Sequence, residues 1–395
     1  MSVRKREWTT PKGEAKSAWI CDYVDTKGVR RQKTFKLKKQ ADAFAATASV
    51  EVREGTHVAD SASVTVKKAG DFWIESGENA GLERSTIDQR KAHLKHHIVP
   101  FIGYVLLSKL TVPAVREFED KLRQEGRSPE MRKKVLTSLG SILADANERG
   151  LATRNPVRDI RGSRKGRDSK TEGRAKKRLR VGVDIPAPHE IKALVAALDG
   201  HWRPLLITAI FTGMRSSELR GLRWEDIDFK RLTISVNQRA DEHGEIGAPK
   251  SEAGTRTIPV PPLVINALKE HRLKHGSNGP LVFGNPDGEP RSHTNIINKG
   301  LLPAMMKAHV TWKKKGDDGE WIETPKYTGL HSLRHFYASW LINRKEDGGL
   351  GLPLKMVQER MGHSSITMTA DTYGHLFPRD DDGDELADAA RFLLT

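Results

Sequence analysis

The sequence of 395 residues contains little cysteine and no long apolar run. Its single cysteine, Cys21, excludes an intramolecular disulfide and any metal site made of thiolates alone. The longest nearly unbroken apolar stretch, residues 205–211, is far shorter than the ~20 residues that a membrane-spanning helix needs. The first residues are charged where a secretory signal requires an apolar segment. We therefore expect a soluble protein of the reducing cytoplasm that has no membrane partner.

Several widespread catalytic motifs are also absent. The sequence has no Walker A loop, no G-x-G-x-x-G fingerprint, no H-E-x-x-H zinc motif and no G-x-S-x-G elbow. It has no internal repeat either. These absences give no reason to expect a nucleotide or metal cofactor.

Positive charge, by contrast, is abundant and lies towards one end. The sequence has 67 Lys and Arg against 51 Asp and Glu, a net charge of +16. The count is +5 for residues 1–60, +4 for 61–160, +8 for 161–180 and −1 for 181–395. The last segment includes an acidic tail, residues 379–395, which alone carries −4. A positive excess of this size indicates a polyanionic partner, the alternative being a solvated basic surface.

Residues 1–60 predict a small β-sheet followed by one helix. Two β-rich runs, residues 18–25 and 29–37, are joined by a short glycine-containing loop. Residues 38–54 lack glycine and proline and predict a helix. The second strand carries a set of basic side chains: Arg30, Arg31, Lys33 and Lys36. Such a strand is either a solvated sheet edge protected by charge or part of a β-ribbon that enters a DNA groove.

Residues 61–160 predict a bundle of four helices with short connections. Ser128 followed by Pro129 is typical of a helix start, and Thr111 is expected to cap another helix. Apolar residues after Ser128 recur at helical spacing and are expected to face the core: Val135, Leu139, Ile142 and Ala146. A cluster of histidines has no cysteine or carboxylate at matching spacing, so we interpret it as polar-face or phosphate-facing rather than metal-binding: His93, His96 and His97.

Residues 161–183 are predicted to be a basic linker. Between residues 161 and 180 the apolar residues are Ala175 and Leu179, too few to build a core. Its basic residues include Arg174, Lys176 and Lys177. The segment is either a plain tether or, as we favour, one that lies along DNA phosphates between two folded domains.

Residues 184–378 predict a mixed α+β domain, and residues 379–395 follow it as the acidic tail. Strands are expected at 232–236 and 257–260, on either side of a polar hairpin. Helices are expected over residues 188–198, 202–211, 262–275, 292–309, 332–343 and 354–361. The chain as a whole is thus expected to be multidomain and mainly α, with small β elements.

Four short pieces of this domain place cations or a proton carrier at a structural transition. They contain, in order, Arg215, Lys250, His331 with Arg334, and His363 with Tyr373. Arg215 sits at a predicted helix start, where free N–H groups favour an anion. Taken singly, each piece has an ordinary interpretation: a surface arginine, a solvated lysine, an exposed polar helix face or a packing tyrosine.

Together, these residues and the phrases around them resemble the tyrosine recombinase family, the phage-type integrases. The phrases are TGMRSSELRGLRWEDID, PKSEAGTRTIPVP, HSLRHFYASWL and MGHSSITMTADTYGHLF. The family's set of Arg, Lys, His-x-x-Arg, His or Trp, and Tyr occurs in the family's order within 159 residues. The resemblance implies an arm-type DNA-binding domain at 1–60, a helical core-binding (SAM-like) domain at 61–160 and the catalytic domain at 184–378.

The resemblance also implies a mechanism. Tyr373 would attack the scissile phosphate, leaving a 3′-phosphotyrosyl bond and a free 5′-hydroxyl. The other family positions would support this step: Arg215 and Arg334 on the phosphate oxygens, Lys250 as the acid for the 5′-oxygen, His331 as acid/base partner of the tyrosine, and His363 as a donor to the phosphate. Because the covalent bond conserves the phosphodiester energy, rejoining needs neither ATP nor a metal.

The implied activity is integration or excision of a phage or mobile element. The implied partners are double-stranded DNA with core-type and arm-type sites, a homotetramer on that DNA, an accessory DNA-bending protein and a directionality factor, in the nucleoid of a bacterial cell. The tail at 379–395 is a possible contact between protomers. Alternatives are a Xer-like resolvase, which would typically lack the arm module, a type IB topoisomerase, and a non-catalytic architectural DNA-binding protein.

Overall fold

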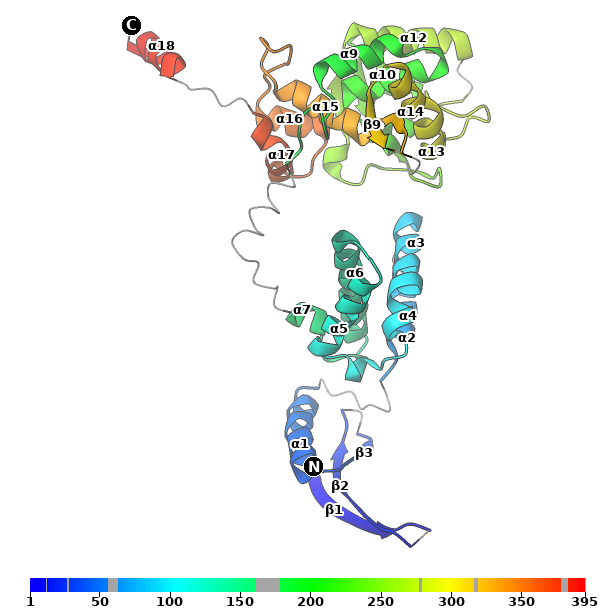
Figure 1. The fold of residues 1–395 in the computed structure, drawn as a ribbon, viewed down its shortest axis with the longest axis vertical. Helices are drawn as coiled ribbons and strands as arrows, with labels where there is room; N and C mark the ends of the chain where they lie inside the picture. The colour runs from blue at the N-terminus through cyan, green and yellow to red at the C-terminus, as the bar shows by residue number, and fades with distance from the viewer. Residues whose placement is uncertain are drawn as a thin grey trace. The chain divides into compact units, whose positions relative to one another are not determined.

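The computed structural model describes residues 1–11, 13–26, 28–55, 63–160, 178–276, 279–315, 319–377 and 383–394 (Figure 1). The chain forms two compact units, residues 1–164 and 165–395. The expected mainly helical architecture with small sheets is confirmed. None of the helices in these described ranges is both long and apolar enough to cross a membrane.

The first unit begins with an antiparallel sheet in the order β1-β2-β3 and one helix. Its elements are β1 (Ser2–Thr9), β2 (Ala15–Val24), β3 (Arg30–Phe35) and α1 (Lys38–Arg53). Ala41 and Ala48 are buried on α1, which packs on the sheet. The predicted strands and helix are confirmed as β2, β3 and α1. Strand β1 was not predicted, because its side chains are almost all exposed and its hydrogen bonds come from β2.

The rest of the first unit is helical, as predicted. Its helices are α2 (Val66–Asn79), α3 (Arg84–His93), α4 (Val99–Ile102), α5 (Val112–Gln124), α6 (Pro129–Glu148) and α7 (Pro156–Asp159), with a π-helical segment (Leu94–Ile98) between α3 and α4. The hydroxyl of Thr111 accepts the Ala114 N–H and that of Ser128 accepts the Met131 N–H, which confirms both predicted caps. The four residues expected to face the core from α6 are all buried.

One expectation for the helical bundle is wrong. His93 is not on a polar or phosphate-facing surface: it is buried, and its Nδ1 lies 2.8 Å from the Ser138 hydroxyl of α6. Burial lowers the pKa of His93, an effect that the neighbouring His97 reinforces, so the ring is a neutral packing residue. Helical spacing did not reveal this, because the partner of His93 lies on α6, which only the tertiary structure brings against α3.

The second unit contains a three-stranded antiparallel sheet in the order β4-β5-β8 and a short β6-β7 ribbon. Its strands are β4 (Ile227–Asp228), β5 (Thr233–Val236), β6 (Arg239–Ala240), β7 (Ile246–Gly247), β8 (Arg256–Pro259), β9 (Thr311–Lys315) and β10 (Trp321–Pro325). The two predicted strands are confirmed as β5 and β8, which pair with each other. The β9-β10 hairpin was not predicted, because β9 is rich in lysine and both strands are mostly exposed and lack an apolar period.

The described part of this unit also contains helices. They are α9 (Pro188–Ala197), α10 (Arg203–Thr212), α11 (Ser216–Arg220), α12 (Pro262–His275), α13 (His293–Asn295), α14 (Leu302–Lys307), α15 (His331–Ile342), α16 (Leu354–Met361), α17 (Ile366–Tyr373) and α18 (Gly383–Leu394). The predicted helices are confirmed, although the one expected at 292–309 contains a π-helical segment (Ile296–Leu301). Helix α17, which ends at Tyr373, was not predicted.

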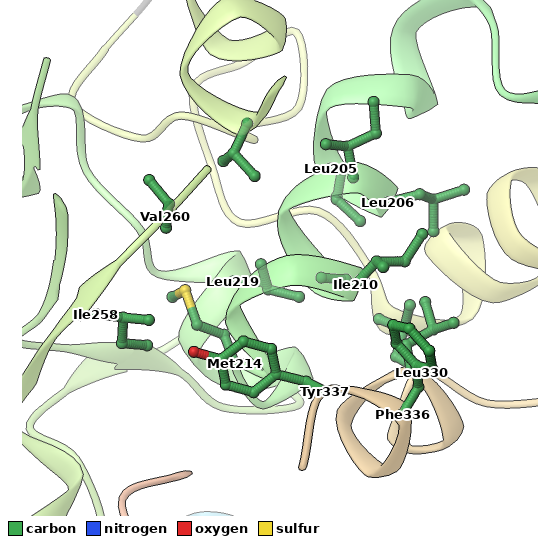
Figure 2. Packing of buried hydrophobic residues seen from close by; sticks show 14 of the residues in the cluster. Leu205, Leu206, Ile210, Met214, Leu219, Ile258, Val260, Leu330, Phe336 and Tyr337 are labelled. Atoms are coloured by element: carbon green, nitrogen blue, oxygen red, sulfur yellow. The ribbon is translucent and has the colours of Figure 1, made fainter. Parts of the chain in front are cut away.

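Helix α10 lies at the centre of this unit. It is apolar on all sides and contacts both α12 and α15. Figure 2 shows Leu205, Leu206 and Ile210 of α10 among side chains from the neighbouring elements. Those neighbours include Ile258 of β8 and Tyr337 of α15. Because α10 leads into the turn before α11, and α15, which packs on α10, also contacts α16, this core helps to fix where the polar site residues stand.

Candidate active site

Arg215 is placed by a tight turn between α10 and α11. Gly213 has a positive φ of 59°, and a Cβ there would lie 2.4 Å from Cδ1 of Tyr337. Both the conformation and the close approach therefore require glycine. Arg215 is the N-cap residue of α11, and its backbone N–H donates to Oε2 of Glu218 at 2.9 Å. The predicted helix start is confirmed.

Glu218 holds two arginines at once. Its Oε1 accepts a hydrogen bond from Nη1 of Arg215 at 2.8 Å, and its Oε2 accepts one from Nη2 of Arg256 at 2.9 Å. Burial opposes ionisation of Glu218, but Arg256 and Arg215 outweigh it and lower the pKa of the carboxyl. Sequence reasoning missed both Glu218 and Arg256. A glutamate three residues after a helix start is a capping-box signal that could have indicated the first.

Lys250 lies on an exposed loop between β7 and β8. The loop passes through a short 3-10 turn (Glu252–Gly254) before β8 begins with Arg256. It packs beside the turn after α16, since a Cβ on Gly362 would lie 3.0 Å from the Ala253 carbonyl oxygen. The expected position of Lys250 before a strand is therefore confirmed.

His331 and Arg334 stand on the first turn of α15. Arg334 is only 2% exposed, and its guanidinium donates to the carbonyl oxygens of Gly213 and Met361. It thus joins the turn before α11 to the end of α16. Burial and the nearby Arg215 lower the pKa of Arg334 to about 9, so it remains charged at neutral pH. Lost hydration of the ring lowers the pKa of His331, and the guanidiniums of Arg334 and Arg215 lower it further. Part of the residue nevertheless stays exposed.

His363 follows the end of α16, where Gly362 adopts a positive φ of 62°. The imidazole Nδ1 lies 2.9 Å from the Thr369 hydroxyl of α17, and the backbone carbonyl accepts a bond from Gln358. The ring is buried, and burial together with Arg334 and other cations lowers its pKa to about 4. His363 is therefore held neutral and in a fixed orientation.

Tyr373 is the last residue of α17 and is only 1% exposed. Its ring lies parallel to that of His363, with centroids 6.2 Å apart. Burial raises the pKa of the phenol to about 12, against the opposing effect of Arg334 and Arg215. Its hydroxyl lies 2.7 Å from Nδ1 of His335, a residue that sequence reasoning missed. The signal available was its spacing, four residues after His331 on the same helix.

The tertiary structure thus links most of the six predicted residues. Arg334 donates to the carbonyl oxygen of Met361, two residues before His363, and Arg215 donates to the Gly362 carbonyl oxygen at 3.2 Å. Helix α16 packs against both α15 and α17 (Figure 1). These helices carry or adjoin His331, Arg334, His363 and Tyr373, whereas Lys250 lies on the loop before β8. A neutral, buried phenol beside two cationic guanidiniums is an arrangement suited to a nucleophile that attacks an anion.

Three of the predicted DNA-binding residues, Arg30, Arg31 and Lys33, belong to the described part of the first unit. Arg31 forms an ion pair with Asp25 at 2.8 Å, Lys33 lies 4.4 Å from the Phe44 ring centroid, and Arg30 is exposed. The linker residues Arg174, Lys176 and Lys177 lie outside the described residues. Within the part of the chain that the structure describes, no three His, Cys, Asp or Glu side chains gather as a metal site would require.

Comparison with known proteins identifies the class. The Phage integrase family matches residues 187–379, and the Phage integrase central domain matches residues 66–163. The chain belongs to the phage integrase family of tyrosine recombinases, enzymes that cleave and rejoin DNA.

Individual relatives cover most of the chain. A protein of Caldanaerobacter subterraneus subsp. tengcongensis described as tyrosine recombinase XerC-like is 27% identical over 378 residues, 89% of each chain. The ICEBs1 integrase of Bacillus subtilis is 25% identical over 77% of each.

Two solved structures share the fold. The Tn1549 transposon integrase in complex with a circular intermediate DNA has a TM-score of 0.60 at 20% identity, covering 84% of this chain and all of that one. A lambda integrase tetramer bound to a Holliday junction has a TM-score of 0.54 at 16% identity, covering 91% and 96%.

Proposed function

We propose that this chain is a site-specific integrase whose Tyr373 forms a transient 3′-phosphotyrosyl bond with DNA while a phage or mobile element is integrated or excised. The single observation that supports the proposal best is the buried Tyr373 hydroxyl in a cluster with Arg334, Arg215 and His363. All four residues stand at the ends of helices that one core holds together.

The two arginines would stabilise the transition state. Attack by Tyr373 on a phosphodiester places additional negative charge on the non-bridging oxygens, and the planar forked donors of Arg215 and Arg334 suit those oxygens. Arg334 already uses part of its donor set on two backbone carbonyls, which fixes its plane. It therefore meets the phosphate without having to be ordered first.

The remaining residues would move or donate protons. Lys250, on its exposed loop, would give a proton to the leaving 5′-oxygen. His363 is neutral, and with Nδ1 accepting from Thr369 its Nε2–H would donate to a phosphate oxygen. His331 stands on the same helix turn as Arg334, and the family resemblance implies an acid/base role for it there. The phosphotyrosyl bond conserves the phosphodiester energy, so the reaction would need no metal or ATP.

The other parts of the chain would hold DNA. We assign residues 1–60 to arm-type sites, 61–160 to core-type sites and 161–183 to phosphate contacts between the domains. The charge excess supports this assignment, since these segments carry +5, +4 and +8, whereas residues 184–378 carry only +3. A tetramer on DNA, a tail at 379–395 that contacts a neighbouring protomer, an accessory bending protein and a directionality factor complete the proposal.

A Xer-like resolvase is the alternative within the family. The sheet β1-β3 with its helix α1 favours the integrase, because a resolvase of this type would typically lack such a module. A non-catalytic architectural protein would explain the charge but gives no reason for a buried tyrosine beside two arginines.

Covalent capture tests the proposal. The full chain is incubated with a library of nicked suicide duplexes that carry a randomised core, and SDS-stable protein–DNA species are recovered and sequenced. We expect enriched duplexes joined to the protein at Tyr373, as peptide mass spectrometry will show. Tyr373→Phe should bind the enriched duplex and form no adduct. A Tyr373→Phe adduct as abundant as that of the wild type would contradict the assignment of the nucleophile.

A further inference from the structure

The hydroxyl of Tyr373 is within hydrogen-bonding distance of a histidine that is not one of the six family positions named above. His335 lies one helical turn after His331 on α15, and its Nδ1 is 2.7 Å from Oη of Tyr373. The two rings meet edge to face, with centroids 5.7 Å apart. We propose that His335 is a catalytic residue, the group that accepts the phenol proton when Tyr373 attacks phosphate. This inference rests on the proposed function of Tyr373.

The surroundings of His335 keep it neutral before the reaction. Burial is the main cause that lowers its pKa to about 4, and His331 and Arg334 add to the effect while Asp184 opposes it. The His331 ring packs against it at right angles, 4.5 Å away between centroids. In the proposed scheme the neutral imidazole carries its own proton on Nε2, so that Nδ1 accepts the hydrogen bond of the Tyr373 hydroxyl.

The low resting basicity of His335 does not prevent transfer during attack. An anionic phosphate bound by Arg215 and Arg334 offsets the cationic charge that disfavours an imidazolium. At the same time, bond formation between Oη and phosphorus removes electron density from the phenol oxygen and makes its proton more acidic. We therefore expect transfer to be concerted with the attack rather than to precede it.

The proton balance of the step is complete. The O–H bond of Tyr373 breaks, its proton moves to Nδ1 of His335, and Oη forms a bond to phosphorus while the bond to the 5′-oxygen breaks. The departing 5′-oxygen takes a proton from the ammonium of Lys250. When the 5′-hydroxyl of a partner strand attacks the phosphotyrosine, both protons return. No oxidant, metal or nucleotide takes part.

His331 has a different place in this scheme. It packs on the ring of His335, whereas the bond to the tyrosine hydroxyl is made by His335. His331 also lies nearer the surface than the buried phenol. It is therefore better suited to position His335 and the phosphate than to take the proton of Tyr373 directly.

Two substitutions separate proton transfer from positioning. His335→Ala removes both the acceptor and the base, whereas His335→Asn places an amide oxygen near the position of Nδ1 and keeps an acceptor without a base. With the duplex enriched by covalent capture, we expect both variants to slow single-turnover cleavage by roughly 10² to 10⁴. His271→Ala, in a buried histidine that contacts the Val282 carbonyl away from this cluster, is the matched control.

A more acidic nucleophile distinguishes a base from a residue that only supports the structure. If His335 were only structural, acidifying the phenol would not restore the cleavage rate of His335→Ala. Trifluorotyrosine at position 373 loses its proton without help, so it should restore cleavage in His335→Ala by tenfold or more and change the wild type far less. Wild-type rates in His335→Asn, or equal effects of trifluorotyrosine on the wild type and His335→Ala, would overturn the proposal. If His335→Ala fails to bind the duplex, the same comparison is made with His335→Asn.

The outcomes also separate this inference from the proposed function. If the wild type forms no adduct at Tyr373, the proposed function fails. If it forms the adduct and the His335 variants cleave at its rate, the proposed function stands and His335 is not the proton acceptor.

Discussion

The carboxylate of Glu218 lies 2.8 Å from the guanidinium of Arg215 and holds it over the start of α11. The same carboxylate pairs with Arg256, the first residue of β8. One buried anion therefore connects the turn that carries Arg215 with the strand that follows the Lys250 loop. The guanidinium is oriented before any phosphate arrives, which is the condition for electrostatic stabilisation of a transition state.

Substitution of Glu218 should destabilise the protein strongly. Glu218→Gln leaves the guanidinium of Arg256, whose side chain is only 6% exposed, without its counter-charge. Removal of one partner from a buried pair costs about 3–5 kcal/mol of unfolding free energy. Glu225→Gln is the control, because its carboxylate pairs with Arg223 at the surface and should contribute at most about 1 kcal/mol. Equal stability losses in urea denaturation of the two full-length variants would contradict the role given to Glu218.

Arg215→Ala should slow cleavage by roughly 10² to 10³, because one contact to the developing charge is lost. Binding of the uncut duplex should change far less, since many other cations hold DNA. Single-turnover rates and gel-shift titrations measure the two effects. Arg231→Ala, at a side chain that is 85% exposed, is expected to cleave like the wild type. Near wild-type cleavage by Arg215→Ala would remove it from the oxyanion site.

The effect of Lys250→Ala on the cleavage rate should depend on the leaving group. With an ordinary duplex we expect cleavage to fall by about 10² or more, because the 5′-oxygen leaves without a proton. With a duplex whose scissile 5′-oxygen is replaced by sulfur, the variant should cleave nearly as fast as the wild type, since a thiol of pKa ~8.5 departs as the anion. The exposed Lys230 gives a control, Lys230→Ala. The same defect on both substrates would show that Lys250 is not the acid.

Acid should destabilise the site through His363. Its pKa is about 4 in the folded chain, mainly because of burial and Arg334, and ~6.5 when unfolded. Since the unfolded chain takes up the proton first, this contribution to stability is complete above pH ~6.5 and is lost as the pH falls towards 4. The loss amounts to about 3 kcal/mol.

The control for this pH effect is His363→Gln, which cannot titrate there. The Tm of the full-length wild type should fall more steeply from pH 7 to pH 4 than that of the variant. Parallel curves of Tm against pH for the two proteins would show that the pKa of His363 in the folded chain is not lowered.

Local features were predictable from the sequence. Thr111 and Ser128 cap their helices because a hydroxyl three positions before a free N–H needs no distant partner. The strands β5 and β8 follow from their apolar residues and the polar hairpin between them. Strand β1 and the β9-β10 hairpin were missed, since polar strands depend on the neighbour that supplies their hydrogen bonds.

The sequence by itself determined where the charge lies, where most of the helices are, and the order of the six residues that resemble the recombinase set. Only the tertiary structure decided that Arg334 reaches the carbonyl of Gly213, 121 positions away, and that His335 meets the hydroxyl of Tyr373, 38 positions away. Charge and helix starts are properties of neighbours along the chain. In the site, the pKa values and the hydrogen-bond partners arise from residues distant in sequence that the core of α10 and α15 brings together, and no local pattern specifies them.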